Sequence, residues 1–197
     1  ESASETYFKN NADEYSIIHL AMHGLMDAKS PIMSSLVFTE DGDSLENNFL
    51  FAHEISKLKL NADLVVLSAC ETAYGKVEKG NGIASLARSF MYAGVPSLIV
   101  SLWHVDDLAT SKIMEEFYHN LSYGMPKGDA LRQAKLRYIK SVKSIYAHPA
   151  FWSPFIQIGD NSSLKVAKKE SGVYIYILSF FGILLAAFFV RMKLKTA

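Results

Sequence analysis

Two short apolar runs end in residues that can do nucleophilic chemistry. Residues 64–67 lead to Cys70, the single cysteine of the chain, and residues 17–22 lead to His23. Such runs indicate strands buried on both faces of a parallel sheet. If these strands are neighbours, His23 and Cys70 emerge at one sheet edge, where a histidine can activate a thiol. The alternative is that Cys70 is a small buried apolar residue.

Two other patterns suggest ligand sites but fail on spacing. His19 and His23 would lie about 13 Å apart on a strand, and a zinc site also needs further ligands. We therefore expect no metal and interpret His19 as a hydrogen-bonded core histidine. Residues 80–82, Gly-Asn-Gly, lack the preceding strand and third glycine of a phosphate-binding loop. We interpret them as a loop that frames the site, and we expect no cofactor.

Strand and helix patterns alternate along the chain around these residues. Strands are predicted at residues 17–22, 35–39, 64–67, 97–102 and 155–158. Helices are predicted at residues 5–12, 51–58, 83–92 and 127–144, and one more begins near Leu108. Alternation of this kind is typical of an α/β fold with a mainly parallel sheet and helices on both faces.

The composition excludes some classes of function. Of the 197 residues, 50% are hydrophobic and 20% are charged, and the formal net charge is +0. This balance gives no indication of nucleic-acid binding, so we expect no nucleic-acid partner. A single cysteine excludes an internal disulfide and is compatible with a reducing compartment.

Four stretches together resemble the CHAT family. They are HLAMHG, LSACETAYG, GNGIASLARSFMYAGVPSLIVSLWHVDD and HPAFWSPFIQIG, and they follow the family's order over residues 5–159. CHAT domains are caspase-like domains commonly attached to tetratricopeptide repeats, and they are more distantly similar to separase. The resemblance implies a caspase-like three-layer α/β/α fold and a cysteine endopeptidase with His23 as base and Cys70 as nucleophile.

The resemblance also implies roles for neighbouring residues. The backbone N–H groups of Gly24 and Cys70 are expected to stabilise the oxyanion of the tetrahedral intermediate. The segment Trp-His-Val-Asp-Asp resembles the part of separase whose acidic residue holds a basic side chain before the scissile bond. The match places that acid at Asp107, with Asp106 beside it. His104 departs from the pattern, and helix capping is an equal alternative for both aspartates.

The C-terminal part of the chain has a different composition. Residues 160–172 are a polar linker, residues 173–190 contain no charged residue, and residues 191–197 form a short basic tail. About 20 apolar residues span a hydrocarbon core of about 30 Å, so residues 173–190 predict a transmembrane helix. Basic residues flank it on both sides and leave its orientation open. We expect a single-pass membrane protein with its peptidase domain in the cytoplasm.

Residues 1–159 are expected to form the C-terminal portion of a CHAT peptidase domain whose first half is missing. We expect tetratricopeptide repeats upstream in the full-length chain. The predicted function is that of a membrane-anchored cysteine endopeptidase that cleaves a protein partner after a basic residue. One alternative is a catalytically silent CHAT scaffold or signalling module. Another is a hydrolase or acyltransferase for a small substrate, which would need a closed pocket.

Overall fold

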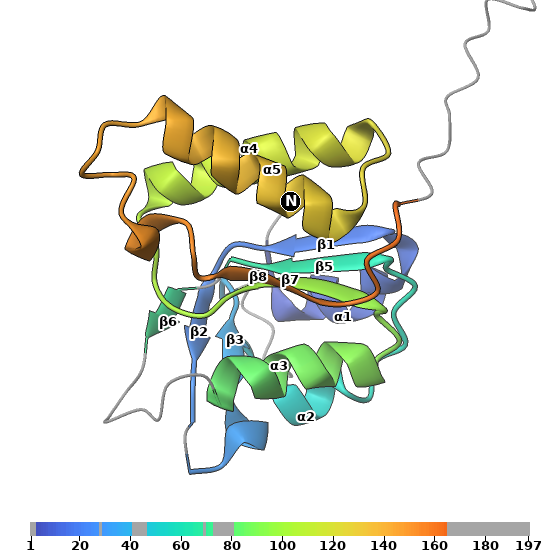
Figure 1. The fold of residues 1–197 in the computed structure, drawn as a ribbon. Helices are drawn as coiled ribbons and strands as arrows, with labels where there is room; N and C mark the ends of the chain where they lie inside the picture. Colours follow the sequence, from blue (N-terminus) through green and yellow to red (C-terminus); the bar gives the residue numbers. More distant parts are fainter. Residues whose placement is uncertain (1–2, 28, 41–46, 69, 73–80, 165–197) are drawn as a thin grey trace, which may run out of the picture. The chain divides into compact units, whose positions relative to one another are not determined.

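The described residues form two four-stranded sheets, and the larger one has longer strands, of four or five residues each. The apolar run Leu64–Leu67 forms β5, an interior strand of this larger sheet (Figure 1). The computed structural model describes residues 3–27, 29–40, 47–68, 70–72 and 81–164. The larger sheet has the order β1-β5-β7-β8 and contains β1 (Ile17–Leu20), β5, β7 (Ser97–Ser101) and β8 (Phe155–Gly159). The first three strands are parallel and β8 is antiparallel to β7. The predicted α/β fold with a mainly parallel sheet is confirmed.

Helices cover both faces of this sheet (Figure 1). The α-helices are α1 (Glu5–Asn11), α2 (Ala52–Ile55), α3 (Asn81–Tyr92), α4 (Asp107–Ser122) and α5 (Lys127–Ser141). The described residues also form short 3-10 helices, η1 (Ala12–Glu14), η2 (Pro31–Met33) and η3 (Pro149–Phe151). Successive residues of a strand point to opposite faces. Accordingly, Leu64 and Val66 join the apolar cluster of α4 and α5, whereas Val65 and Leu67 join that of α1 and α3.

The second sheet has the order β4-β3-β2-β6. Its strands are β2 (His23–Leu25), β3 (Ser35–Val37), β4 (Phe49–Phe51) and β6 (Cys70–Thr72). β2 is parallel to β6 and antiparallel to β3, and β3 is antiparallel to β4. The prediction of one strand over residues 17–22 is therefore corrected. β1 ends at Leu20, and the chain enters the second sheet at His23, because β2 pairs with different strands than β1 does.

The helix predictions hold except at one place. α1, α3, α4 and α5 lie where the periodicity predicts them, within a few residues at their ends. The helix predicted at residues 51–58 spans only Ala52–Ile55, because Phe49–Phe51 are paired with β3. Gly94 follows α3 with a φ of 108°, a backbone conformation that suits glycine after a helix end.

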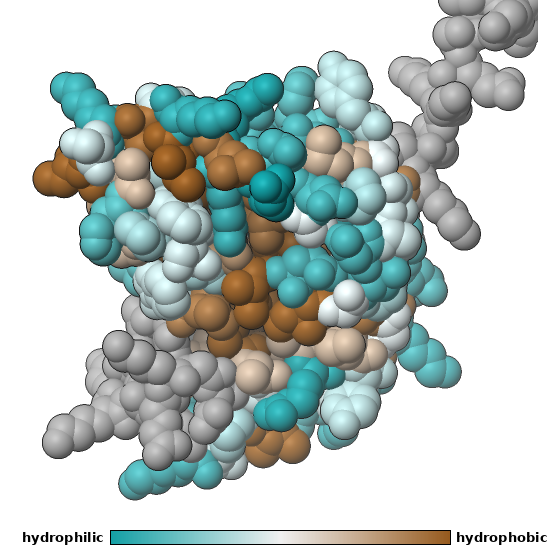
Figure 2. All heavy atoms as spheres, viewed as in Figure 1, coloured by the Kyte–Doolittle hydropathy of each residue, from teal (hydrophilic) through white to brown (hydrophobic). Residues whose placement is uncertain are grey.

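Among the described residues, β8 is the last strand at one edge of the larger sheet, and most of its residues are partly exposed. Apolar side chains, brown in Figure 2, gather along the course that β8 follows in Figure 1. On this strand Ile156 and Ile158 are half-buried, whereas Phe155 is buried against α5.

Several predictions fall outside the described residues. These are most of the loop that includes Gly80, the greater part of the polar linker, the transmembrane helix at residues 173–190 and the basic tail at residues 191–197. Within the described ranges, no helix has the length and apolar character needed to cross a bilayer. The expected division of the chain into residues 1–159, 160–172, 173–190 and 191–197 stays a prediction.

Candidate functional site

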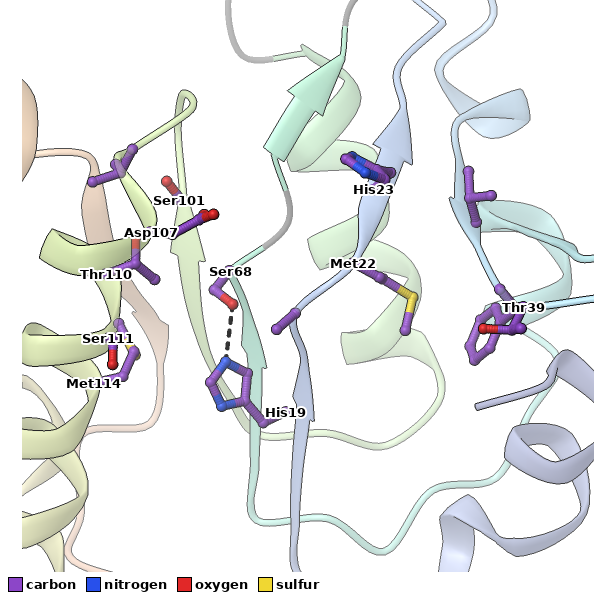
Figure 3. A pocket seen from close by; sticks show the side chains of 14 residues that line it. His19, Met22, His23, Thr39, Ser68, Ser101, Asp107, Thr110, Ser111 and Met114 are labelled. Carbon is purple, nitrogen blue, oxygen red and sulfur yellow. Dashed lines mark hydrogen bonds between the residues drawn. The ribbon is translucent and has the colours of Figure 1, made fainter. Parts of the chain in front are cut away.

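A cavity of about 680 Å³ opens where the two sheets meet α4. Its lining comes from both sheets and from the start of α4, and comprises His19, Ala21, Met22, His23, Val37, Phe38, Thr39, Ser68, Ser101, Val105, Asp107, Thr110, Ser111 and Met114. Figure 3 shows Asp107, Thr110 and Ser111 on one side, Met22 and Thr39 on the other, and His19 between them. One wall is therefore acidic and hydroxylic, and the opposite wall is mainly apolar.

His23 and Cys70 are paired across neighbouring parallel strands. They are the first residues of β2 and β6, and their Cα atoms are register partners. Neighbouring strands lie about 4.8 Å apart, so the two backbones are adjacent. His23 is exposed and lines the cavity. The sequence expectation that the two residues lie close together agrees with this pairing. They follow β1 and β5 of the first sheet after two intervening residues, and each begins a strand of the second sheet. The side chain of Cys70 lies outside what the structure describes, so its role as nucleophile stays a prediction.

Gly24 occupies an interior position of the second sheet. It is buried, and β2 places it opposite Leu36 of β3 on one side and Glu71 of β6 on the other. A backbone between two paired strands is held in a fixed orientation by the ladder. The expected contribution of its N–H group to an oxyanion hole stays a prediction.

His19 is hydrogen-bonded as expected but is not a core residue. Its side chain lines the cavity and is only partly open to solvent, and its Nε2 lies 2.9 Å from Oγ of Ser68 (Figure 3). The ring of Tyr118 packs against the imidazole, with 5.7 Å between the ring centroids. Burial by this surrounding protein lowers the pKa of His19 below 6.5, which favours the neutral imidazole.

Tyr118 shields one side of His19. Burial raises the pKa of its phenol to about 12, so the hydroxyl stays protonated at neutral pH. Among the described residues, this hydroxyl finds no hydrogen-bond partner. The sequence analysis did not identify Ser68 or Tyr118 as site residues. The position of Ser68, immediately after a buried strand, was the signal that could have identified it.

Asp106 and Asp107 are adjacent in sequence but have different surroundings. Asp106 is the N-cap residue of α4, and its Oδ1 accepts a hydrogen bond of 3.0 Å from the backbone N–H of Ala109. Asp107 is the first residue of the helix and lines the cavity. The structure therefore brings Asp107 to the same cavity as His23, while the carboxylate of Asp106 serves as a helix cap.

The described residues contain no group of three or more His, Cys, Asp or Glu side chains that could hold a metal ion. The cavity is lined by two imidazoles, one carboxylate and several hydroxyls, and the backbone of Cys70 is paired with that of His23. These groups can exchange protons and bind a cationic side chain.

Comparison with known proteins identifies the family. Residues 1–160 match the CHAT domain. Tetratricopeptide repeat protein 28 of Mus musculus is 32% identical over 124 residues, which cover 63% of this chain and 5% of that protein. Tetratricopeptide repeat protein 28 of Homo sapiens is 32% identical over 130 residues, again 63% of this chain and 5% of that protein. Because the match spans most of the chain, this protein belongs to the CHAT domain family, a caspase-like family.

Proposed function

We propose that this CHAT domain is a cysteine endopeptidase in which His23 activates the thiol of Cys70. The observation that carries the proposal is the register pairing of these two residues beside a cavity that His23 lines. Helices on both faces of the mainly parallel sheet are also in keeping with a caspase-like three-layer α/β/α fold.

In the proposed reaction, His23 accepts the thiol proton and the sulfur attacks the carbonyl carbon of the scissile peptide bond. The C–N bond then breaks, and His23 passes the proton to the leaving amine. Water hydrolyses the thioester and restores the thiol. The backbone N–H groups of Cys70 and Gly24 are the proposed donors to the oxyanion, and one such donor lowers the barrier by about 3 kcal/mol.

The proposed substrate is a protein segment with arginine or lysine before the scissile bond. Asp107 supplies the carboxylate, because it lines the cavity that His23 also lines. A carboxylate binds a guanidinium or ammonium group through charge-assisted hydrogen bonds. Thr110 and Ser111, on the same helix and in the same cavity, add hydroxyl groups that can accept hydrogen bonds from that side chain.

The setting of the domain in the full-length protein is also a proposal. The relatives are named as tetratricopeptide repeat proteins and are much longer than the matched segment. We propose that repeats precede this domain and present the protein partner to it. The apolar residues 173–190 are proposed to anchor the chain in a membrane, with the domain in the cytoplasm. Retention of the full chain in the membrane pellet after alkaline carbonate extraction is expected, and release into the supernatant would contradict the anchor.

A covalent probe tests the proposed activity. A peptidyl acyloxymethyl ketone with arginine at its reactive end should label the wild-type chain, and the label should map to Cys70, the single cysteine. His23→Gln should remove most of the labelling, because a neutral thiol is a poor nucleophile. His104→Gln is the matched control, since His104 is exposed and is not part of the cavity lining. Equal labelling of the wild-type and His23→Gln chains would contradict the proposed base.

A second candidate function is a catalytically silent interaction module. The position of Gly24 favours it, because a buried glycine between two paired strands has little freedom to turn its N–H group toward a substrate. Protein folds often host several unrelated functions. In this case the chain would bind its partner without cleaving it, and the covalent probe would label no more than an ordinary exposed thiol does.

A further inference from the structure

The chain passes from the first sheet to the second just before each residue of the proposed dyad, and it does so in the same way at both places. Two residues separate Leu20 of β1 from His23 of β2, and two residues separate Leu67 of β5 from Cys70 of β6. In the first sheet His19 pairs with Val66, and in the second His23 pairs with Cys70. The sequence separation is the same in both pairs. The parallel ladder therefore passes from one sheet to the other without gaining or losing a residue on either strand.

Ser68 makes two hydrogen bonds to β1 at the point where the chain passes from the first sheet to the second. Its backbone N–H donates a hydrogen bond of 3.2 Å to the carbonyl oxygen of Leu20. Its Oγ lies 2.9 Å from Nε2 of His19, the hydrogen bond drawn in Figure 3. The imidazole is itself supported by the ring of Tyr118 on α4. The side chains of His19 and Ser68 thus join β1 and β5 immediately before the residues that begin β2 and β6.

We propose that His19 and Ser68 are positioning residues that clamp this strand crossing and so keep His23 and Cys70 in register. The need for a clamp follows from strand geometry. Side chains alternate between the two faces of a sheet, so a slip of one residue would pair His23 with a neighbour of Cys70 and turn the cysteine to the opposite face. β6, Cys70–Thr72, is a short strand, and among the described residues it pairs with β2 alone. Its own ladder therefore fixes its register weakly.

The catalytic consequence of the clamp rests on the proposed function, but the clamp itself does not. Neither His19 nor Ser68 takes part in the proposed reaction. They would affect the reaction by fixing the position of the backbone that leads to Cys70. The structural and catalytic consequences can therefore be measured separately.

The first experiment measures the register by disulfide trapping. Register partners on neighbouring strands lie close to the Cα separation that a disulfide spans. His23→Cys in the full chain should therefore cross-link to Cys70 under mild oxidation, as shown by mass spectrometry of the tryptic peptides. Adding Ser68→Ala should slow this cross-link by about tenfold, and adding Ser68→Thr, which retains the hydroxyl, should slow it much less.

Two variants make this experiment specific. Ser122→Ala is the matched control, because it removes a serine hydrogen bond of 2.7 Å to the carbonyl oxygen of His119, away from the cavity. If Ser68→Ala prevents folding, His19→Phe removes the same hydrogen bond while keeping an aromatic ring against Tyr118. Equal cross-linking rates with and without the His19–Ser68 bond would overturn the clamp, whether or not the chain is a peptidase.

The second experiment measures the consequence for the thiol. The rate of iodoacetamide alkylation of the single cysteine is followed against pH, and its midpoint reports how strongly a base assists the thiol. Loss of the clamp should move the midpoint in the same direction as His23→Gln, and Ser68→Thr should restore it. A clamp variant with the wild-type profile would overturn the positioning role. Labelling of Ser68 by a fluorophosphonate would also overturn it, because Ser68 would then be a nucleophile with His19 as its base.

Discussion

His19 and His23 lie on consecutive strands of different sheets, β1 and β2, yet both line one cavity. The two imidazoles have different surroundings. His19 is hydrogen-bonded to Ser68 and packs against Tyr118, whereas His23 begins the strand that pairs with Cys70. This difference agrees with the proposed roles, in which His19 holds the strands in place and His23 transfers the proton.

Removal of the thiol should separate catalysis from partner binding. Cys70→Ala should lower the rate of cleavage of an arginyl peptide by at least about 1,000-fold, because the nucleophile is lost. Binding of an uncleaved partner should persist, since the fold is retained. The measurements are the initial cleavage rate, partner binding by calorimetry and the thermal unfolding temperature. Unchanged cleavage by a folded Cys70→Ala chain would mean that a contaminating peptidase cleaves the peptide. That result would favour the silent interaction module.

The adjacent aspartates provide a matched pair for testing substrate preference. Asp107→Asn should reduce kcat/KM for arginyl peptides by about 10- to 100-fold, because a hydrogen bond between charged groups contributes about 1.5–3 kcal/mol. Asp106→Ala should leave the preference for arginine unchanged and lower the free energy of unfolding by about 1 kcal/mol, because it removes the cap of α4. Competition between arginyl and alanyl peptides measures the preference, and denaturant titration measures the stability.

The reverse result for this pair has a clear meaning. If Asp106→Ala changes the preference and Asp107→Asn does not, the basic side chain binds outside the cavity that Asp107 lines. If each variant loses both the preference for arginine and unfolding free energy, the start of α4 acts as one structural unit.

The protonation of His19 should make the folded state less stable in mild acid. Burial lowers the pKa of His19 below its usual 6.5, so the unfolded chain binds this proton more readily than the folded chain does. Stability contributed by the neutral imidazole is complete above about pH 7.5 and is lost as the pH falls through 6.5 toward the lowered folded-state value. His19→Gln should therefore show a smaller decrease in unfolding temperature between pH 7.5 and 5.5, measured in matched buffers. An identical pH dependence in both chains would contradict the effect of burial.

The last residue of β8, Gly159, should tolerate no side chain. This glycine has a φ of 86°, and a Cβ atom there would clash with the carbonyl oxygen of Pro96. Gly159→Ala should therefore displace the backbone that pairs with Ser97 and destabilise the fold by more than the ordinary cost of a left-handed alanine, about 1–2 kcal/mol. Gly124→Ala is the control, because Gly124 has a φ of 77° with no atom within 4 Å of the added Cβ. Equal losses of unfolding free energy in both variants would show that backbone strain alone matters.

Most elements could be predicted from local sequence patterns. The run Leu64–Leu67 is apolar at every position, and it forms a strand with all four residues buried. The apolar stripe of residues 83–92 lies within α3, and Pro126 immediately precedes α5. These predictions succeeded because burial on one face of a helix, or on both faces of a strand, requires a particular spacing of apolar residues.

Other features could not be predicted, because they depend on pairing between distant segments. The run at residues 17–22 shows no local signal of a change of sheet. Phe51, predicted to begin a helix, instead ends β4, which pairs with β3. The hydrogen bond between His19 and Ser68 joins residues from different strands, and no periodicity reports it.

The sequence by itself determined which residues can do chemistry and which segments form strands and helices, because residue type and apolar spacing are local properties. It also determined the family, because four motifs follow one another in the family's order. Only the tertiary structure decided that β1 and β5 cross into a second sheet in step, that His23 and Cys70 are register partners, and that Asp107 but not Asp106 lines the cavity. Those relationships depend on backbone hydrogen bonds and packing between segments far apart in sequence, and such contacts form only when the chain is folded.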